Sequence, residues 1–164
     1  MKNMPFTDSH TRMRSHLLLL KDEAVGLGAS DAKIIPADMI RVEDEIIEMC
    51  KAPRCEGYGK SANCPPHVMG PERAREWIRE YPAAVLFKID VPAALLVSPD
   101  RFEAFRRVYE ISSALEAISV EAGYVFSKAL GAGSCKPVFC PETPCQILEG
   151  TGCLLYTSDA ADEL

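Results

Sequence analysis

Two short runs of cysteine constrain the fold of this chain more than any other feature. The first run spans residues 50–67 and the second spans residues 135–145. Both contain prolines and glycines, which disfavour regular helix or strand. Because an irregular loop can wrap its side chains around a bound ion, we expect two metal-binding loops. The rest of the chain would then be a scaffold that brings the loops together.

The thiolates of the first loop are spaced to share one metal site. Cys50 and Cys55 are separated by four residues, and Cys55 and Cys64 by eight. Three thiolates leave one position open in a tetrahedral site, and His67 is the nearest candidate for it. A ligand from elsewhere, an open coordination position, or a surface role for His67 agrees with the sequence equally well. The second loop supplies a second set of candidate ligands, namely Cys135, Cys140 and Cys145.

Gly131 and Gly133 precede the second set and are candidate cofactor-binding positions. Glycine lets the backbone approach a bound group, so the N–H groups here could donate hydrogen bonds to thiolates or cluster sulfides. The third glycine of a dinucleotide-binding loop is missing, which argues against nucleotide binding.

Length and composition predict one domain, because 164 residues with 48% hydrophobic content can bury a single core. We found no secretory signal and no apolar run of about 18 residues, so we expect a cytoplasmic protein without membrane contact. In a reducing compartment, clustered cysteines favour metal binding or redox chemistry over disulfides. The net charge of −6, with lysine and arginine interleaved among acids, argues against nucleic-acid binding.

Residues 153–164 match the translation of a transposase sequencing adapter. A segment of that origin would not belong to the natural protein or contribute to its fold. We therefore expect residues 1–152 to form a single metal-binding α/β domain that is truncated at its C-terminus. Cys153 is accordingly not counted among the ligands.

Hydrophobic periodicity predicts three main helices, over residues 9–28, 71–81 and 99–122, and a short acidic helix or irregular stretch over residues 42–49. Gly28 and Gly123 follow two of the helices as C-terminal glycines.

Apolar runs predict strands over residues 31–35, 83–89 and 124–130. The last two strands flank the long third helix, so we expect a βαβ unit with parallel strands. The predicted class is α/β, a small layered sheet with two cysteine-rich loops.

The cysteine spacings leave the metal open. Cysteine precedes proline at Cys64 and Cys140, as at the end of ferredoxin cluster motifs. No Cys-x-x-Cys pair occurs, which weakens both a zinc ribbon and a thioredoxin-like pair. Buried inert thiols are the alternative, but six cysteines crowded into two polar loops are poorly explained that way. We favour an iron–sulfur cluster over zinc.

The pattern Cys50-x4-Cys55-x2-Tyr58-Gly59-Lys60-x3-Cys64-Pro65-Pro66-His67 resembles the predicted metal-binding proteins grouped as domain of unknown function 2284. The resemblance covers about residues 20–152 and implies a small cysteine-rich protein that binds an iron–sulfur cluster or another metal. The second loop of the family is often more tightly spaced than here. The family also continues past a further cysteine into an Arg-Pro-Ser-Met-Glu-Ala-like segment, which the tail replaces.

Three functional hypotheses follow. The first is electron transfer, or redox support of a partner protein, through an iron–sulfur cluster. The second is a structural zinc module whose function lies in a partner-binding surface. The third is a thiol-based or metal-dependent enzyme, for which His67 and Lys60 are the nearby candidate bases. The sequence favours them in that order.

Overall fold

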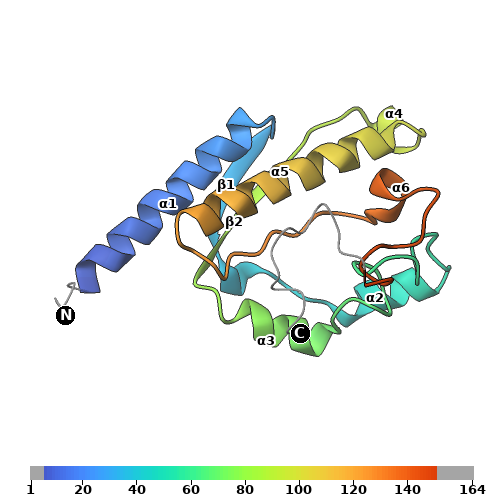
Figure 1. The fold of residues 1–164 in the computed structure, drawn as a ribbon, viewed down its shortest axis with the longest axis horizontal. Helices are drawn as coiled ribbons and strands as arrows, with labels where there is room; N and C mark the ends of the chain where they lie inside the picture. Colours follow the sequence, from blue (N-terminus) through green and yellow to red (C-terminus); the bar gives the residue numbers. More distant parts are fainter. Residues whose placement is uncertain (1–5, 151–164) are drawn as a thin grey trace.

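Two long helices lie over a small sheet in the computed structural model, which describes residues 6–150 (Figure 1). The elements in chain order are α1 (Phe6–Gly26), β1 (Asp31–Pro36), the 3-10 helix η1 (Ala37–Met39), α2 (Asp44–Lys51), α3 (Pro71–Ile78), β2 (Ala83–Lys88), α4 (Ala93–Leu96), α5 (Arg101–Glu121) and α6 (Lys136–Phe139). This mixture of helix and strand confirms the α/β class. The predicted tail, residues 153–164, lies outside the described residues.

The core forms where α1 and α5 meet the sheet. Leu20 and Ala24 of α1 pack in one buried cluster with Ile111 and Leu115 of α5. These four residues belong to the predicted apolar stripes of the two helices, because a period of 3.6 residues places them on one face. Gly28 follows α1 with φ of 111°, the left-handed conformation expected of a C-terminal glycine.

The sheet is antiparallel, so the predicted parallel βαβ unit is wrong. Asp31 of β1 lies opposite Lys88 of β2, and Pro36 lies opposite Ala83. Within residues 6–150, β2 pairs with β1 alone. Although its sequence is almost entirely apolar, β2 is not buried on both faces, because Leu86 is 60% exposed.

Residues 124–130, predicted as a strand, form turns and irregular backbone instead. Their polar backbone groups find side-chain partners in place of a sheet. Tyr81 Oη donates to the Phe126 carbonyl at 2.8 Å, and the Ala129 N–H donates to Glu116 Oε2 at 2.7 Å. Phe126 and Leu130 remain 81% and 69% exposed, so the apolar run gains little burial.

The two cysteine loops are far apart in the chain but lie on the same side of the molecule (Figure 1). The first loop lies between α2 and α3, inside the connection from β1 to β2. The second follows α5 and contains α6, a short helix that the sequence did not predict. Within residues 6–150, no helix is long and apolar enough to cross a membrane.

Candidate metal centre

Helix α5 anchors the second cysteine loop through buried and half-buried side chains. Tyr109, which is buried, donates from Oη to the Gly133 carbonyl at 2.5 Å and packs edge-on against Phe139 with ring centroids 5.8 Å apart. Arg106 Nη2 donates to the Val138 carbonyl at 2.7 Å. A hydrogen bond from a charged donor is stronger than one from a neutral donor. The Arg106 bond therefore holds α6 firmly against α5.

The packing of α5 also explains the two glycines that precede this loop. A Cβ on Gly131 would overlap the Tyr109 ring, and Gly133 has a positive φ of 79°. Both positions therefore need glycine for reasons internal to the protein. Their role as N–H donors to a bound group stays a prediction.

The first loop is built from consecutive tight turns. Its backbone N–H groups bond back to carbonyls three residues earlier, as in Tyr58 to Cys55 at 3.1 Å and Cys64 to Ser61 at 3.1 Å. The Gly59 N–H donates to the Pro65 carbonyl at 2.8 Å and closes the loop across its width. These bonds order the loop without secondary structure, as the prolines and glycines predicted.

Helix α2 carries the first cysteine of this loop, because Cys50 lies in its last turn. An ion pair joins α2 to α3, with Arg75 Nη2 2.6 Å from Asp44 Oδ2. Arg75 Nε also donates to the Val42 carbonyl at 3.1 Å. One arginine therefore joins α2 and α3, the two helices that flank the first loop.

The two cysteine loops contact each other, which confirms the prediction that the scaffold brings them together. Asn63 Nδ2 donates to Cys135 Sγ across a distance of 3.6 Å. The backbone N–H of Ala62 also donates toward the Cys145 thiol. Two consecutive residues of the first loop therefore direct N–H groups at two sulfurs of the second.

A third contact involves a glycine of the first loop. A Cβ built on Gly57 would lie 3.0 Å from Ser134 Cβ and 3.3 Å from Cys64 Sγ. The absence of a side chain at Gly57 thus lets both Ser134 and the buried thiol of Cys64 pack closely against the Gly57 backbone. Gly57 was predicted only as a loop former, and nothing in the sequence distinguished it from neighbouring glycines.

The electrostatic surroundings favour the thiolate form of Cys145. Burial would raise the pKa of this thiol, but N–H groups of Leu148, Ala62 and Ile147, together with the nearby Lys136 ammonium, lower its pKa overall. Hydrogen bonds and positive charge stabilise a thiolate and hence a metal ligand. Lys136 itself donates to the carbonyls of Cys140 and Pro141, the latter at 3.1 Å.

Ser61 is a further polar group in the first loop. The residue is fully buried, and its Oγ has no hydrogen-bond partner within residues 6–150. A buried hydroxyl without a partner is costly and calls for an explanation. Two residues of the chain separate Ser61 from Cys64. Six cysteines that form no disulfide within residues 6–150 lie on these loops, so the polar and soft donors fit a bound metal group.

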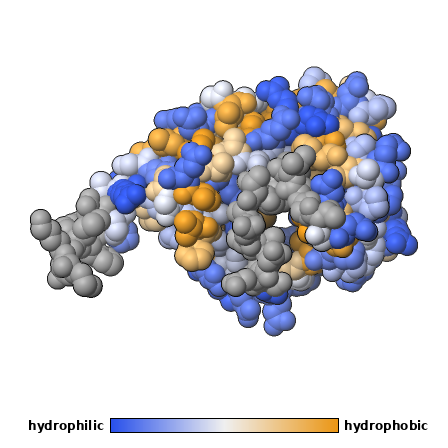
Figure 2. Space-filling view, viewed as in Figure 1, coloured by the Kyte–Doolittle hydropathy of each residue, from blue (hydrophilic) through white to orange (hydrophobic). Residues whose placement is uncertain are grey.

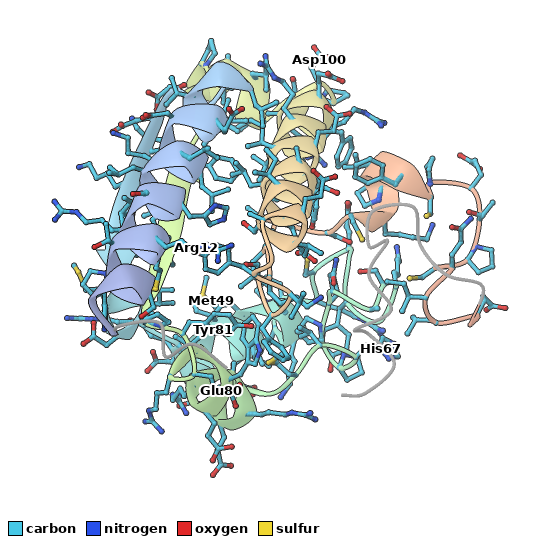
Figure 3. The ribbon with its side chains drawn as sticks, turned by 60° about the vertical axis from the view of Figure 1, so that its left-hand side comes forward. Arg12, Met49, His67, Glu80, Tyr81 and Asp100 are labelled. Atoms are coloured by element: carbon cyan, nitrogen blue, oxygen red, sulfur yellow. The ribbon has the colours of Figure 1, made fainter. Side chains whose placement is uncertain are left out.

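The predicted ligands are near one another but are not gathered into a finished site. No group of three or more histidine, cysteine, aspartate or glutamate side chains within residues 6–150 is arranged to hold a metal ion. Cys64 is buried, whereas Cys55 and His67 are exposed. Figure 3 shows His67 on the side of the cysteine loops. Ligation by the full predicted set would require these loops to draw closer.

The fold and the loops together define a small α/β protein with six cysteines on two adjoining loops. The chain belongs to the family described as predicted metal-binding protein (DUF2284), whose model matches residues 33–159. The match includes both loops and confirms the resemblance found in the sequence. It also includes part of the tail, residues 153–159. No curated protein and no solved structure matches this chain.

Proposed function

We propose that the two loops together bind an iron–sulfur cluster and that the protein transfers electrons to, or supports the redox chemistry of, a cytoplasmic partner protein. The proposed ligands are drawn from Cys50, Cys55, Cys64, His67, Cys135, Cys140 and Cys145. The observation that carries the proposal is the contact between the loops, in which Asn63 Nδ2 lies 3.6 Å from Cys135 Sγ.

The residues around the thiols support a redox role. A bound cluster would supply one-electron chemistry at a potential set by hydrogen bonds to its sulfurs and by solvent exposure. Asn63 and the Ala62 N–H already direct donors at cysteine sulfurs. Donors of this kind stabilise negative charge on sulfur and tune a metal centre.

A structural zinc module is the second candidate, favoured by a different observation. Within residues 6–150 no three potential ligands are gathered at one point. Metal binding would then order the loops, as in domains where the free energy of binding contributes to folding. The function would lie in a partner-binding surface.

A reductive titration separates the two candidates. Protein purified without oxygen is titrated with dithionite while visible absorption and electron paramagnetic resonance are recorded, and circular dichroism follows the metal-free form. Reversible one-electron bleaching with folding retained after metal removal supports the cluster. Colourless protein that loses tertiary structure with its zinc overturns the redox proposal.

Two single variants test whether both loops serve one centre. Cys64→Ser changes the first loop and Cys145→Ser changes the second, and a shared centre predicts that each loses most of the bound metal. Cys153→Ser is the matched control, because Cys153 is not among the proposed ligands. Loss of half of the metal in each variant would instead indicate two independent sites.

A further inference from the structure

A second site lies along α5, toward the C-terminal end of the helix from the residues that anchor the second cysteine loop, and it depends on none of the cysteines. It is a cavity of about 380 Å³ between α1, the sheet, α3 and α5. Ligand pockets in proteins span about 300–1,000 Å³ and are mostly apolar with a few polar groups. Leu86 and Leu130 line the cavity while remaining 60% and 69% exposed, so it is open to solvent. Figure 2 shows hydrophobic side chains reaching the surface beside α1.

One face of α5 supplies the polar groups. Ser112, Leu115, Glu116 and Ser119 all line the cavity, and their spacing places them along a single helical stripe. Ser119 Oγ donates to the Leu115 carbonyl at 2.9 Å. The hydroxyl of Ser112 differs, because it is buried and has no hydrogen-bond partner within residues 6–150.

The ionisable groups of the cavity compensate each other. Lys128 Nζ lies 3.4 Å from Glu116 Oε1, and the two side chains are only 22% and 11% exposed. Glu116 also accepts a hydrogen bond from the Ala129 N–H at 2.7 Å. A charged ligand would have to enter an apolar space where this cation and anion are already paired, which is costly. The lining therefore matches a neutral ligand.

We propose that this cavity binds a neutral, mostly apolar small molecule with one hydrogen-bonding group that pairs with Ser112 Oγ. The apolar body would contact Trp77, Val85 and Phe87, which line the cavity. The hydroxyl of Ser112, which lacks a partner in the free protein, would gain one in the complex.

The natural reporter of binding is Trp77, the single tryptophan of the chain. The probe is N-phenyl-1-naphthylamine, a neutral apolar amine, and binding is followed as energy transfer from Trp77. Its sulfonated analogue, 8-anilino-1-naphthalenesulfonate, has the same ring skeleton with a negative charge. We expect one neutral probe per chain and at least tenfold weaker binding of the sulfonate.

Two variants locate the probe. Ala129→Phe fills the cavity and should weaken binding at least tenfold, whereas Ala94→Phe, the same substitution at an exposed position outside the lining, should leave it unchanged. Ser112→Ala should weaken binding about two- to tenfold, as expected for one hydrogen bond. It should also raise the melting temperature of the free protein by roughly 2–4 °C, because a buried unpaired hydroxyl is removed.

Three results would overturn the proposal. One is equal binding of the two probes, and another is unchanged binding by both Ala129→Phe and Ser112→Ala. The third is displacement of the probe as the protein self-associates in light scattering, which would make this surface an interface between copies. Ser112→Ala changes one oxygen, so it keeps the test decisive if Ala129→Phe fails to fold.

Discussion

Replacing Gly57 with alanine tests whether the close packing of the two loops is needed for metal binding. The added Cβ would lie 3.0 Å from Ser134 Cβ and 3.3 Å from Cys64 Sγ, so these neighbours must move by a few tenths of an ångström. The φ of Gly57 is not positive, hence the backbone accepts alanine without strain. The effect of Gly57→Ala is therefore confined to the packing of Ser134 and of the Cys64 thiol around this residue.

The magnitude follows from this geometry. Overpacking by one methyl group costs about 1 kcal/mol, which lowers the melting temperature by about 2–4 °C in a protein of this size. Metal sites tolerate ligand displacements of about 0.2 Å, and disturbed supporting contacts reduce metal affinity by roughly 10- to 100-fold. We expect at least a tenfold loss of zinc affinity in competition with a chromophoric chelator.

Gly26→Ala is the matched control. A Cβ on Gly26 meets nothing within 4 Å, and the residue ends α1, far in the chain from both loops. Alanine in a helix is favoured over glycine by about 0.5–1 kcal/mol, so this variant should melt slightly higher with unchanged zinc affinity. If Gly57→Ala bound zinc and melted as the unaltered protein does, the inference that the loops form one packed site would be refuted.

Three further predictions concern the thiols and their anchor. Asn63→Leu removes the donor to Cys135 Sγ and should lower the potential of a bound cluster by about 20–60 mV, measured by redox titration; an unchanged potential would remove Asn63 from the site. Arg106→Ala removes the bond to the Val138 carbonyl and should destabilise the fold by about 1–3 kcal/mol in urea unfolding, whereas equal stability would deny that α5 anchors the loop. The lowered pKa of Cys145 means that its thiolate stabilises the metal-free fold above the ordinary thiol pKa, and that this contribution disappears as pH falls through the lowered pKa. Unfolding midpoints between pH 7 and about 9.5 should therefore rise with pH, and Cys145→Ser should flatten that rise.

The longer helices and the two strands could be predicted because short-range signals define them. The apolar stripe of α1, the proline at the start of α3 and the glycine after α5 each act within a few residues. The pairing of the strands could not be predicted in the same way. Residues 37–82 connect β1 to β2, and no local signal fixes the direction in which such a long connection returns.

The apolar run of residues 124–130 shows why periodicity alone misleads. Its composition is that of a strand, yet Tyr81 and Glu116 take the hydrogen bonds that a sheet would have made. Both partners lie outside the run itself. The sequence therefore does not indicate that the backbone of residues 124–130 bonds to these side chains rather than to β2. The α6 turn was missed for the same reason, since its anchors Arg106 and Tyr109 lie on α5.

The site was predictable in part. The cysteines stood out by residue type and crowding, and the contact between the loops was expected. The loops are held together by the packing of Tyr109 and Phe139 and by the contacts of Asn63 and Gly57. Such residues support the thiols from outside the cysteine pattern, and their contacts exist only in the folded chain.

The central claim is that thiols from both loops hold a metal, and the measurement that tests it most directly is metal content. Iron, zinc and acid-labile sulfide are quantified per chain, together with the visible absorption spectrum, on protein purified without oxygen. We predict brown protein with iron and sulfide in near-equal amounts. Protein that retains neither iron nor zinc, with its thiols still reduced, would contradict it.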